Sequence, residues 1–164
     1  MFFCQFTSRS EAETEAVAAA LARAVQEPVV ICLEGDLGAG KTAFSRGFVH
    51  GMALDEAAAQ VAVTSPTFAI MQPYEEGRLP VYHFDLYRLH GPEDLEAIGA
   101  DDLLDNPDGV LLVEWPERAA DWFPKDRLMI QLTIHSDQQR HIAMGAGGPR
   151  TTQLLQSLQS ESNA

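Results

Sequence analysis

The residues of this chain that most clearly specify chemistry lie in one short stretch, LEGDLGAGKTAFSRG, at positions 33–47. Gly35, Gly40, Lys41 and Thr42 fit the pattern G-x-x-x-x-G-K-[ST] without a mismatch. In that pattern the lysine reaches the β- and γ-phosphates of a nucleotide, and the threonine hydroxyl takes a position on Mg²⁺. The start of the helix that follows adds partial positive charge. The pattern therefore predicts a nucleotide phosphate site.

The backbone of this glycine-rich loop is expected to supply most of the contacts. Gly35, Gly38 and Gly40 allow positive φ and carry no side chain, so successive N–H groups can turn inward around phosphate oxygens. We expect the nucleotide to be contacted along Leu37, Gly38, Ala39 and Gly40, in addition to the lysine and threonine that follow.

A Mg²⁺ site beside this loop requires a second protein group in addition to Thr42, and that group is usually an acid at the end of a buried strand. The run GVLLVE, at 109–114, passes from four aliphatic residues directly to Glu114. A carboxylate in that position is costly unless it faces solvent or a cation. Beside a phosphate loop, Glu114 is therefore predicted to be a ligand of Mg²⁺, direct or through water. The alternative is an ordinary carboxylate at a strand end.

Asp85, in HFDLY, is a second candidate acid. It alternates with Phe84 and Leu86, so on a strand its side chain points away from theirs. One interpretation places it near the γ-phosphate, where it orients the attacking water or a metal-bound water. The other is a surface aspartate on a half-exposed strand. The stretch 65–67, Ser-Pro-Thr, offers hydroxyls beside a rigid turn and is either a phosphate-sensing switch or a simple loop.

Supporting elements are predicted on both sides of these groups. Ser10 and Glu13 have the spacing of a capping box and open an alanine-rich segment that favours a helix over 10–25. The continuous apolar run at 28–35 is typical of a strand buried on both faces. EEGRLP, between two strand-like stretches, could form a hairpin connection. The other predicted elements are helices over 40–52 and 92–99 and strands over 67–74, 81–87, 108–115, 127–135 and 140–144.

Composition and charge bound the protein class. The chain is 46% hydrophobic and 21% charged, and its 24 acidic against 11 basic residues give a formal net charge of −13. Such a surface repels phosphate backbones, so direct capture of nucleic acid is disfavoured. Two isolated cysteines suggest a reducing compartment, and neither a secretory signal nor a bilayer-length apolar run is recognisable. We expect a cytoplasmic protein.

The length of the chain and the absence of a linker predict one domain. No internal repeat or domain-sized linker interrupts the chain, so residues 1–148 are expected to form a single α/β domain. Residues 149–164 are expected to be a polar tail with one weak amphipathic patch, fraying at 160–164.

Four motifs, GDLGAGKT, TSPTF, VYHFDLYRL and VEWPE, closely resemble the bacterial TsaE (YjeE) family in their order and spacing. The resemblance runs from about Ser10 to Arg140. HFDLYR and EWPE are its specific parts, since the phosphate loop alone fits many unrelated proteins. That family is the ATPase component of the machinery that makes threonylcarbamoyladenosine at position 37 of tRNA.

The resemblance implies a P-loop NTPase-like α/β fold, with a mixed central sheet flanked by helices in a three-layer sandwich. It implies a protein that binds ATP or ADP with Mg²⁺ and hydrolyses ATP slowly alone. It also implies association with the TsaB–TsaD heterodimer, of which TsaD transfers the threonylcarbamoyl group to tRNAs reading ANN codons. The tRNA is then met only indirectly, through the complex.

Roles carry over from the family by motif. The resemblance implies that Lys41 contacts phosphate, that Thr42 and Glu114 hold Mg²⁺, and that Asp85 lies beside the γ-phosphate. Lys41, Asp85 and Glu114 are thus the catalytic candidates. Trp115 is a neighbour of the metal acid, and it is either a contact anchor for a partner or a core residue.

Two further positions are implied as nucleotide contacts. Glu11, at the first helix, and Arg140, at the late strand pair, fall where the family closes over the nucleoside. The alternative for Glu11 is the capping box, and for Arg140 a surface arginine.

Two other functions use the same loop. A small-molecule kinase would bring an arginine-rich lid, and no arginines cluster after Glu114 to form one. A nucleotide-dependent adaptor would bind ATP without needing hydrolysis, and nothing in the sequence separates it cleanly from an ATPase.

Overall fold

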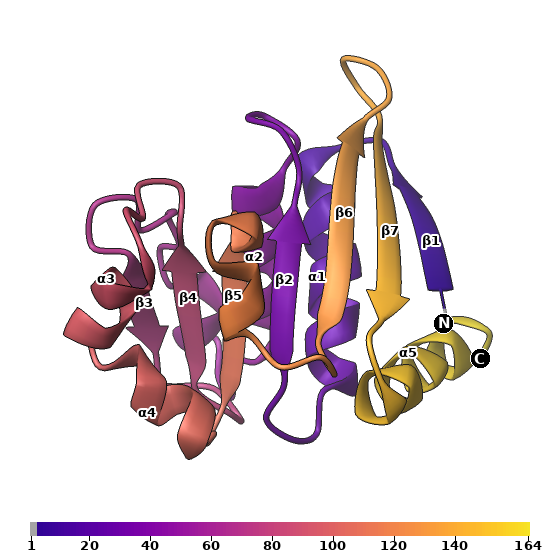
Figure 1. Ribbon diagram of the computed structural model, residues 1–164. Helices are drawn as coiled ribbons and strands as arrows, with labels where there is room; N and C mark the ends of the chain where they lie inside the picture. The colour runs from indigo at the N-terminus through magenta and orange to yellow at the C-terminus, as the bar shows by residue number, and fades with distance from the viewer. Residues whose placement is uncertain (1–2) are drawn as a thin grey trace.

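The computed structural model describes residues 3–164 and contains one seven-stranded sheet with helices on both faces (Figure 1). Its elements are β1 Phe3–Ser8, α1 Glu11–Ala24, β2 Val30–Glu34, α2 Lys41–Gly51, η1 Ala58–Gln60, β3 Met71–Tyr74, β4 Val81–Asp85, α3 Pro92–Ala97, α4 Ala100–Asp105, β5 Val110–Glu114, η2 Pro116–Trp122, β6 Leu128–Ile134, β7 Arg140–Ala146 and α5 Pro149–Ser162. The strand order is β1-β7-β6-β2-β5-β4-β3. The middle strands β6, β2, β5 and β4 are parallel, and antiparallel strands close both ends.

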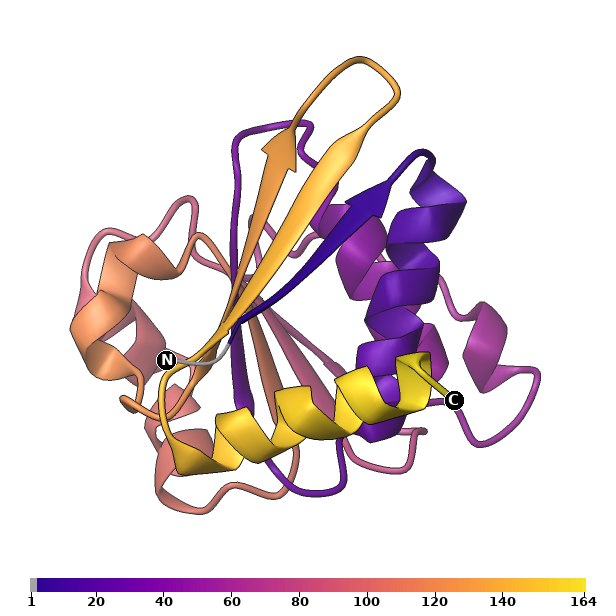
Figure 2. The same ribbon diagram turned by 90° about the vertical axis from the view of Figure 1, so that its right-hand side faces the viewer.

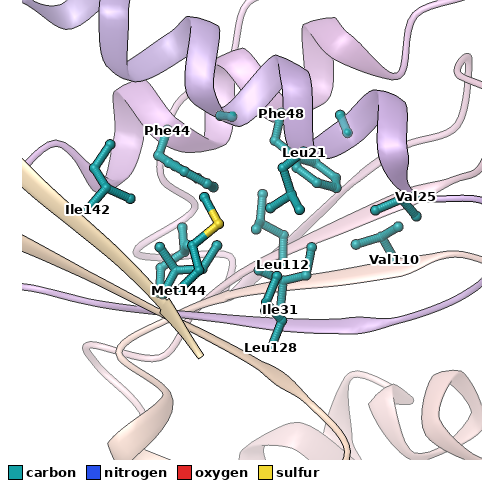
Figure 3. Close-up of a cluster of buried hydrophobic side chains, with 14 of the residues drawn as sticks. Leu21, Val25, Ile31, Phe44, Phe48, Val110, Leu112, Leu128, Ile142 and Met144 are labelled. Atoms are coloured by element: carbon teal, nitrogen blue, oxygen red, sulfur yellow. The ribbon is translucent and has the colours of Figure 1, made fainter. Parts of the chain in front are cut away.

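Two hydrophobic clusters, one on each face of the sheet, make the protein a three-layer sandwich. On one face α1 and α2 cover the sheet, with Leu21, Phe44 and Phe48 packed toward Ile31 and Leu112 (Figure 3). On the opposite face the cluster contains residues of α3, α4 and η2 together with the other side chains of β4 and β5. The predicted α/β class and its mixed central sheet are confirmed.

Local signals account for most of the elements. The Ser10 hydroxyl accepts the Glu13 N–H at 3.1 Å and starts α1, as the capping box predicts. The Glu13 carboxylate returns to the N–H of Arg9, at 2.6 Å, one residue earlier than in the standard box. The predicted hairpin is confirmed, since β3 pairs antiparallel with β4. The predicted strand over 67–74 is shorter, because β3 begins only at Met71.

Helices α1 and α2 approach closely because small residues line their contact. A Cβ atom added to Gly47 would overlap the backbone of Glu15. One added to Gly51 would lie 2.7 Å from the Cα of Ala19. The small residues of α1 thus let α2 pack closely against it, and this contact fixes the position of α2 and of the glycine-rich loop at its start.

The C-terminal segment differs from the expected polar tail. Residues 149–162 form α5, whose Leu155 and Leu158 are buried in the same cluster as α1, and Figure 2 shows α5 along the lower part of the molecule. Its first turn is held by Asp126, which accepts the Thr151 hydroxyl at 2.7 Å and two backbone N–H groups. Burial raises the pKa of Asp126, but these hydrogen bonds outweigh it, so that the pKa lies below its usual value.

The sequence missed α5 for a physical reason, because only a narrow apolar stripe in a polar helix meets the core. It also missed β1, an edge strand with alternating exposure, and the short helix α4. None of the helices formed by residues 3–164 is both long and apolar enough to span a bilayer.

Candidate functional site

The glycine-rich loop leads from the end of β2 into α2. Gly38 and Gly40 have φ values of 82° and 105°, in the left-handed region that glycine adopts readily. Gly35 does not use the positive φ that glycine allows. It is needed for a close approach instead, since a Cβ there would lie 2.7 Å from the carbonyl oxygen of Leu132.

Lys41 begins α2 and lies buried beneath the loop. Its ammonium group donates to the carbonyl of Gly35 and, at 3.2 Å, to that of Asp36. It also lies 4.0 Å from the ring centroid of Trp115. Burial lowers the pKa of Lys41, while nearby carboxylates, Glu114 foremost, act in the opposite direction. A desolvated cation at the mouth of a loop of N–H groups is suited to binding an anion.

A chain of hydrogen bonds joins the two groups predicted to hold Mg²⁺. The Thr42 hydroxyl lies 2.7 Å from the Ser65 hydroxyl. Ser65 in turn donates to Oε2 of Glu114 at 2.9 Å. Thr42 and Glu114, distant in sequence, therefore lie on either side of one serine hydroxyl. This arrangement places hard oxygen donors from α2, the 65–67 stretch and β5 together.

Asp85 ends β4 directly beside Glu114, since the two residues are partners in the parallel pair β4–β5. Its side chain is only 3% exposed, which excludes the surface aspartate that the sequence left open. One carboxylate oxygen accepts the Thr67 hydroxyl at 2.8 Å, and the other accepts the N–H of Tyr87 at 3.0 Å. Ser65 and Thr67 thus tie one short stretch to both acids.

His83, which was not among the residues predicted from the sequence, lies against Glu114. It is fully buried, and its Nε2 is 2.6 Å from Oε2 of Glu114. A usable signal existed, because His83 precedes Asp85 by two residues and alternate residues of a strand share a face.

Trp115 follows Glu114 in an unusual backbone conformation, with φ 57° and ψ 48°. Its side chain is half-buried, and its ring centroid lies 5.0 Å from that of Tyr87. With the ammonium of Lys41 on the ring as well, Trp115 is neither a free surface anchor nor a fully buried core residue. It forms a wall of the site.

One cavity of about 840 Å³ is lined by the side chains described above other than His83, including Lys41, Thr42, Ser65, Thr67, Asp85, Glu114 and Trp115. The cavity lies at the carboxyl ends of the parallel strands β2, β4 and β5, where ligands bind in open α/β sheets. Of the sequence-predicted residues, those that line it are Glu11, Leu37, Gly38, Gly40, Lys41, Thr42, Asp85, Glu114 and Arg140. Residues that line it without having been predicted include Arg9, Thr14, Asp137 and Gln138.

Ala39 is the predicted residue that the cavity does not expose. Its side chain is buried, and its N–H donates to the carbonyl of Asp36 at 3.0 Å, within the loop itself. The rim is formed by two separate elements. Glu11 is exposed on α1, where its carboxylate lies 3.6 Å from Arg46, and Arg140 donates to the carbonyl of Gly38 at 3.2 Å.

Fold and site together define a P-loop NTPase-like α/β protein, with its glycine loop, lysine, hydroxyl and two buried acids at one end of the sheet. Residues 8–142 match the family model described as "Threonylcarbamoyl adenosine biosynthesis protein TsaE". The chain belongs to the TsaE family.

Individual relatives agree with this assignment. The tRNA threonylcarbamoyladenosine biosynthesis protein TsaE of Bacillus subtilis is 38% identical over 151 residues, which cover 92% of this chain and 90% of that protein. The protein of the same name from Treponema pallidum is 37% identical, over 84% of this chain and 96% of its own length. The crystal structure of Bacillus subtilis YdiB superposes with a TM-score of 0.79 at 32% identity, covering 98% of this chain and 97% of that one.

Proposed function

We propose that the protein is a Mg²⁺-dependent ATPase that supports threonylcarbamoylation of adenosine 37 in tRNAs reading ANN codons. The observation that carries the proposal is the Thr42–Ser65–Glu114 chain of hydrogen bonds beside the phosphate loop. The pathway is proposed from its relatives, which are named as proteins of tRNA threonylcarbamoyladenosine biosynthesis.

The donor set fits Mg²⁺, which prefers oxygen ligands and keeps several waters when it is bound through substrate phosphates. Thr42 and Glu114 would hold the ion. Within residues 3–164 no three His, Cys, Asp or Glu side chains form a metal cage, so phosphate and water would complete the shell. When bound, the ion would neutralise charge on the phosphates during transfer.

The chain's own residues divide the remaining work. Lys41 binds the β- and γ-phosphates, exchanging its loop carbonyls for phosphate oxygens. Asp85 accepts a hydrogen bond from the attacking water and orients it in line with the γ-phosphate. Leu37, Gly38, Ala39 and Gly40 are proposed to follow the phosphates along the loop.

Glu11 and Arg140 are proposed to contact the nucleoside of ATP or ADP, since both lie at the rim of the cavity. The hydrogen bond from Arg140 to Gly38 already connects that rim to the phosphate loop.

The TsaB–TsaD heterodimer is the proposed partner, and tRNA is reached only through that complex. A net charge of −13 disfavours direct capture of an RNA backbone. Phe68, next to Thr67, is 82% exposed with the Arg88 guanidinium 4.2 Å from its ring, as suits an aromatic contact anchor near the γ-phosphate position. Because tRNA modification with ATP takes place where both are made, we propose a cytoplasmic protein.

Hydrolysis by the purified chain, alone and then with TsaB–TsaD and tRNA, tests the proposal. We expect weak activity alone that rises with the heterodimer. Asp85→Asn should bind ATP like the wild type and lose hydrolysis by about 100-fold or more. The neutral amide is a weaker acceptor than the carboxylate for the hydrogen bond from the attacking water. If Asp85→Asn supports full tRNA modification, the protein acts as a nucleotide-dependent adaptor. If ATP consumption rises instead with a small acceptor, it is a kinase.

A further inference from the structure

We infer that His83 is a positioning residue that holds the Glu114 carboxylate ready for the metal ion. The inference rests on the proposed function and adds to it a residue outside the phosphate loop. His83 lies on β4 and Glu114 at the end of β5, on the face of the sheet that α1 and α2 cover.

The contact between the two side chains is short and buried from solvent. Nε2 of His83 lies 2.6 Å from Oε2 of Glu114, with the side chains 0% and 3% exposed. An ionised carboxylate can only accept, so the ring nitrogen in this pair carries the hydrogen and donates it. The hydrogen bond is therefore charge-assisted and screened from water, which makes it strong and directional.

The rest of the imidazole gives no other reason for a histidine at this position. Nδ1 is buried and has no hydrogen-bond partner within residues 3–164. An unsatisfied buried nitrogen is costly, and an apolar side chain of similar size would avoid that cost. The bond to Glu114 is thus the polar contact that a histidine supplies here and an apolar residue would not.

Ser65 cannot hold the Glu114 carboxylate in the same way before and after the ion binds. Its hydroxyl lies between Thr42 and Glu114, which is where an ion bound by both residues must enter. The serine must therefore give up at least one of its hydrogen bonds when the ion binds. His83 contacts Glu114 from the interior of the sheet, so its bond can persist in both states and keep the carboxylate oriented.

The variants His83→Phe, His83→Asn and His83→Gln separate the hydrogen bond from packing. Phenylalanine keeps ring bulk without a donor, and asparagine has an amide that is too short to reach Glu114. Glutamine places an amide N–H near the position of Nε2. Phe84→Leu is the matched control, because Phe84 is buried on the same strand but packs on the opposite face.

The measurement is calorimetric titration of the full chain with a non-hydrolysable ATP analogue, once with Mg²⁺ and once with a chelator. We expect His83→Phe and His83→Asn to reduce the gain in affinity due to Mg²⁺ by about 10- to 100-fold. Metal-free affinity should stay within about twofold, because the phosphate loop is untouched. His83→Gln should recover most of the Mg²⁺ effect, and Phe84→Leu should leave it unchanged while lowering the Tm.

The outcomes are distinguishable. If the wild type shows no Mg²⁺-dependent nucleotide binding, the proposed function itself is wrong. If the wild type shows it and both His83→Phe and His83→Asn retain it in full, the positioning role is wrong. Equal losses with and without Mg²⁺, accompanied by a lower Tm, would show that His83 only supports the fold. If His83→Phe does not fold, the comparison of the two amide variants decides.

Discussion

The two faces of the strand pair β4–β5 differ sharply, although the ten residues of these two strands simply alternate between them. On the face toward α1 and α2, Val110 and Leu112 belong to one hydrophobic cluster. At the site end of that face, which we call the polar face, His83, Asp85 and Glu114 bring three titratable groups into the interior. On the other face Phe84 and Val113 belong to a cluster of apolar residues from α3, α4 and η2. Strand alternation alone assigns each residue to its face.

The difference teaches how one sheet serves two purposes. The apolar face is stabilised by burial and packing, so a deletion there should reduce the free energy of unfolding. On the polar face the buried carboxylates are tied to partners, Asp85 to Thr67 and Glu114 to Ser65, and only Nε2 of the His83 ring has a partner within residues 3–164. Removing a polar side chain there should reduce nucleotide binding or hydrolysis more than it reduces the free energy of unfolding.

The largest effect is expected on the apolar face. Phe84→Ala should lower the free energy of unfolding by about 3–5 kcal/mol, because a fully buried phenyl ring leaves a cavity. Urea unfolding followed by circular dichroism measures it. At low temperature the folded fraction should still bind nucleotide with about wild-type affinity. If binding is lost while the protein remains folded, the two faces are not independent.

On the polar face, Lys41→Met should reduce ATP hydrolysis by about 10²- to 10³-fold, since the methionine keeps length and contact with Trp115 but loses the cation. Lys41 is buried, not at the surface, so its stability effect needs its own measurement. We expect a change of about 1 kcal/mol or less in urea unfolding. Lys125→Met, at the chain's exposed second lysine, is the control and should change neither quantity. Normal turnover by Lys41→Met would contradict the phosphate-loop assignment.

The last prediction concerns the Cys32 thiol on the apolar face, where we expect an effect on chemical reactivity and none on function. Burial raises its pKa to about 12, so at pH 8 the thiol stays protonated and the reactive thiolate is scarce. In a Cys4→Ser variant, where Cys32 is the only remaining cysteine, alkylation by iodoacetamide should be on the order of a thousandfold slower in the native than in the urea-unfolded protein. Mass spectrometry measures both rates. Rapid native labelling would indicate that this face opens to solvent.

Local patterns predicted those elements and residues whose requirements are local. The β-branched run of β2, the capping serine of α1 and the glycine loop each carry their own signal, and all three were found. β1 and α5 carry weak signals, because one is an edge strand and the other presents a narrow stripe. Their places depend on β7 and α1, which only the folded chain brings near them.

The sequence by itself determined a glycine-rich loop between a buried strand and a helix, two acids at strand ends and the family to which the chain belongs. The tertiary structure alone decided that Ser65 lies between Thr42 and Glu114, that Lys41 contacts Trp115 and that His83 contacts Glu114. The physical reason is sequence separation. A loop or cap is set by neighbouring residues, whereas these contacts join residues 23 to 74 positions apart and exist only after the strands have paired in register.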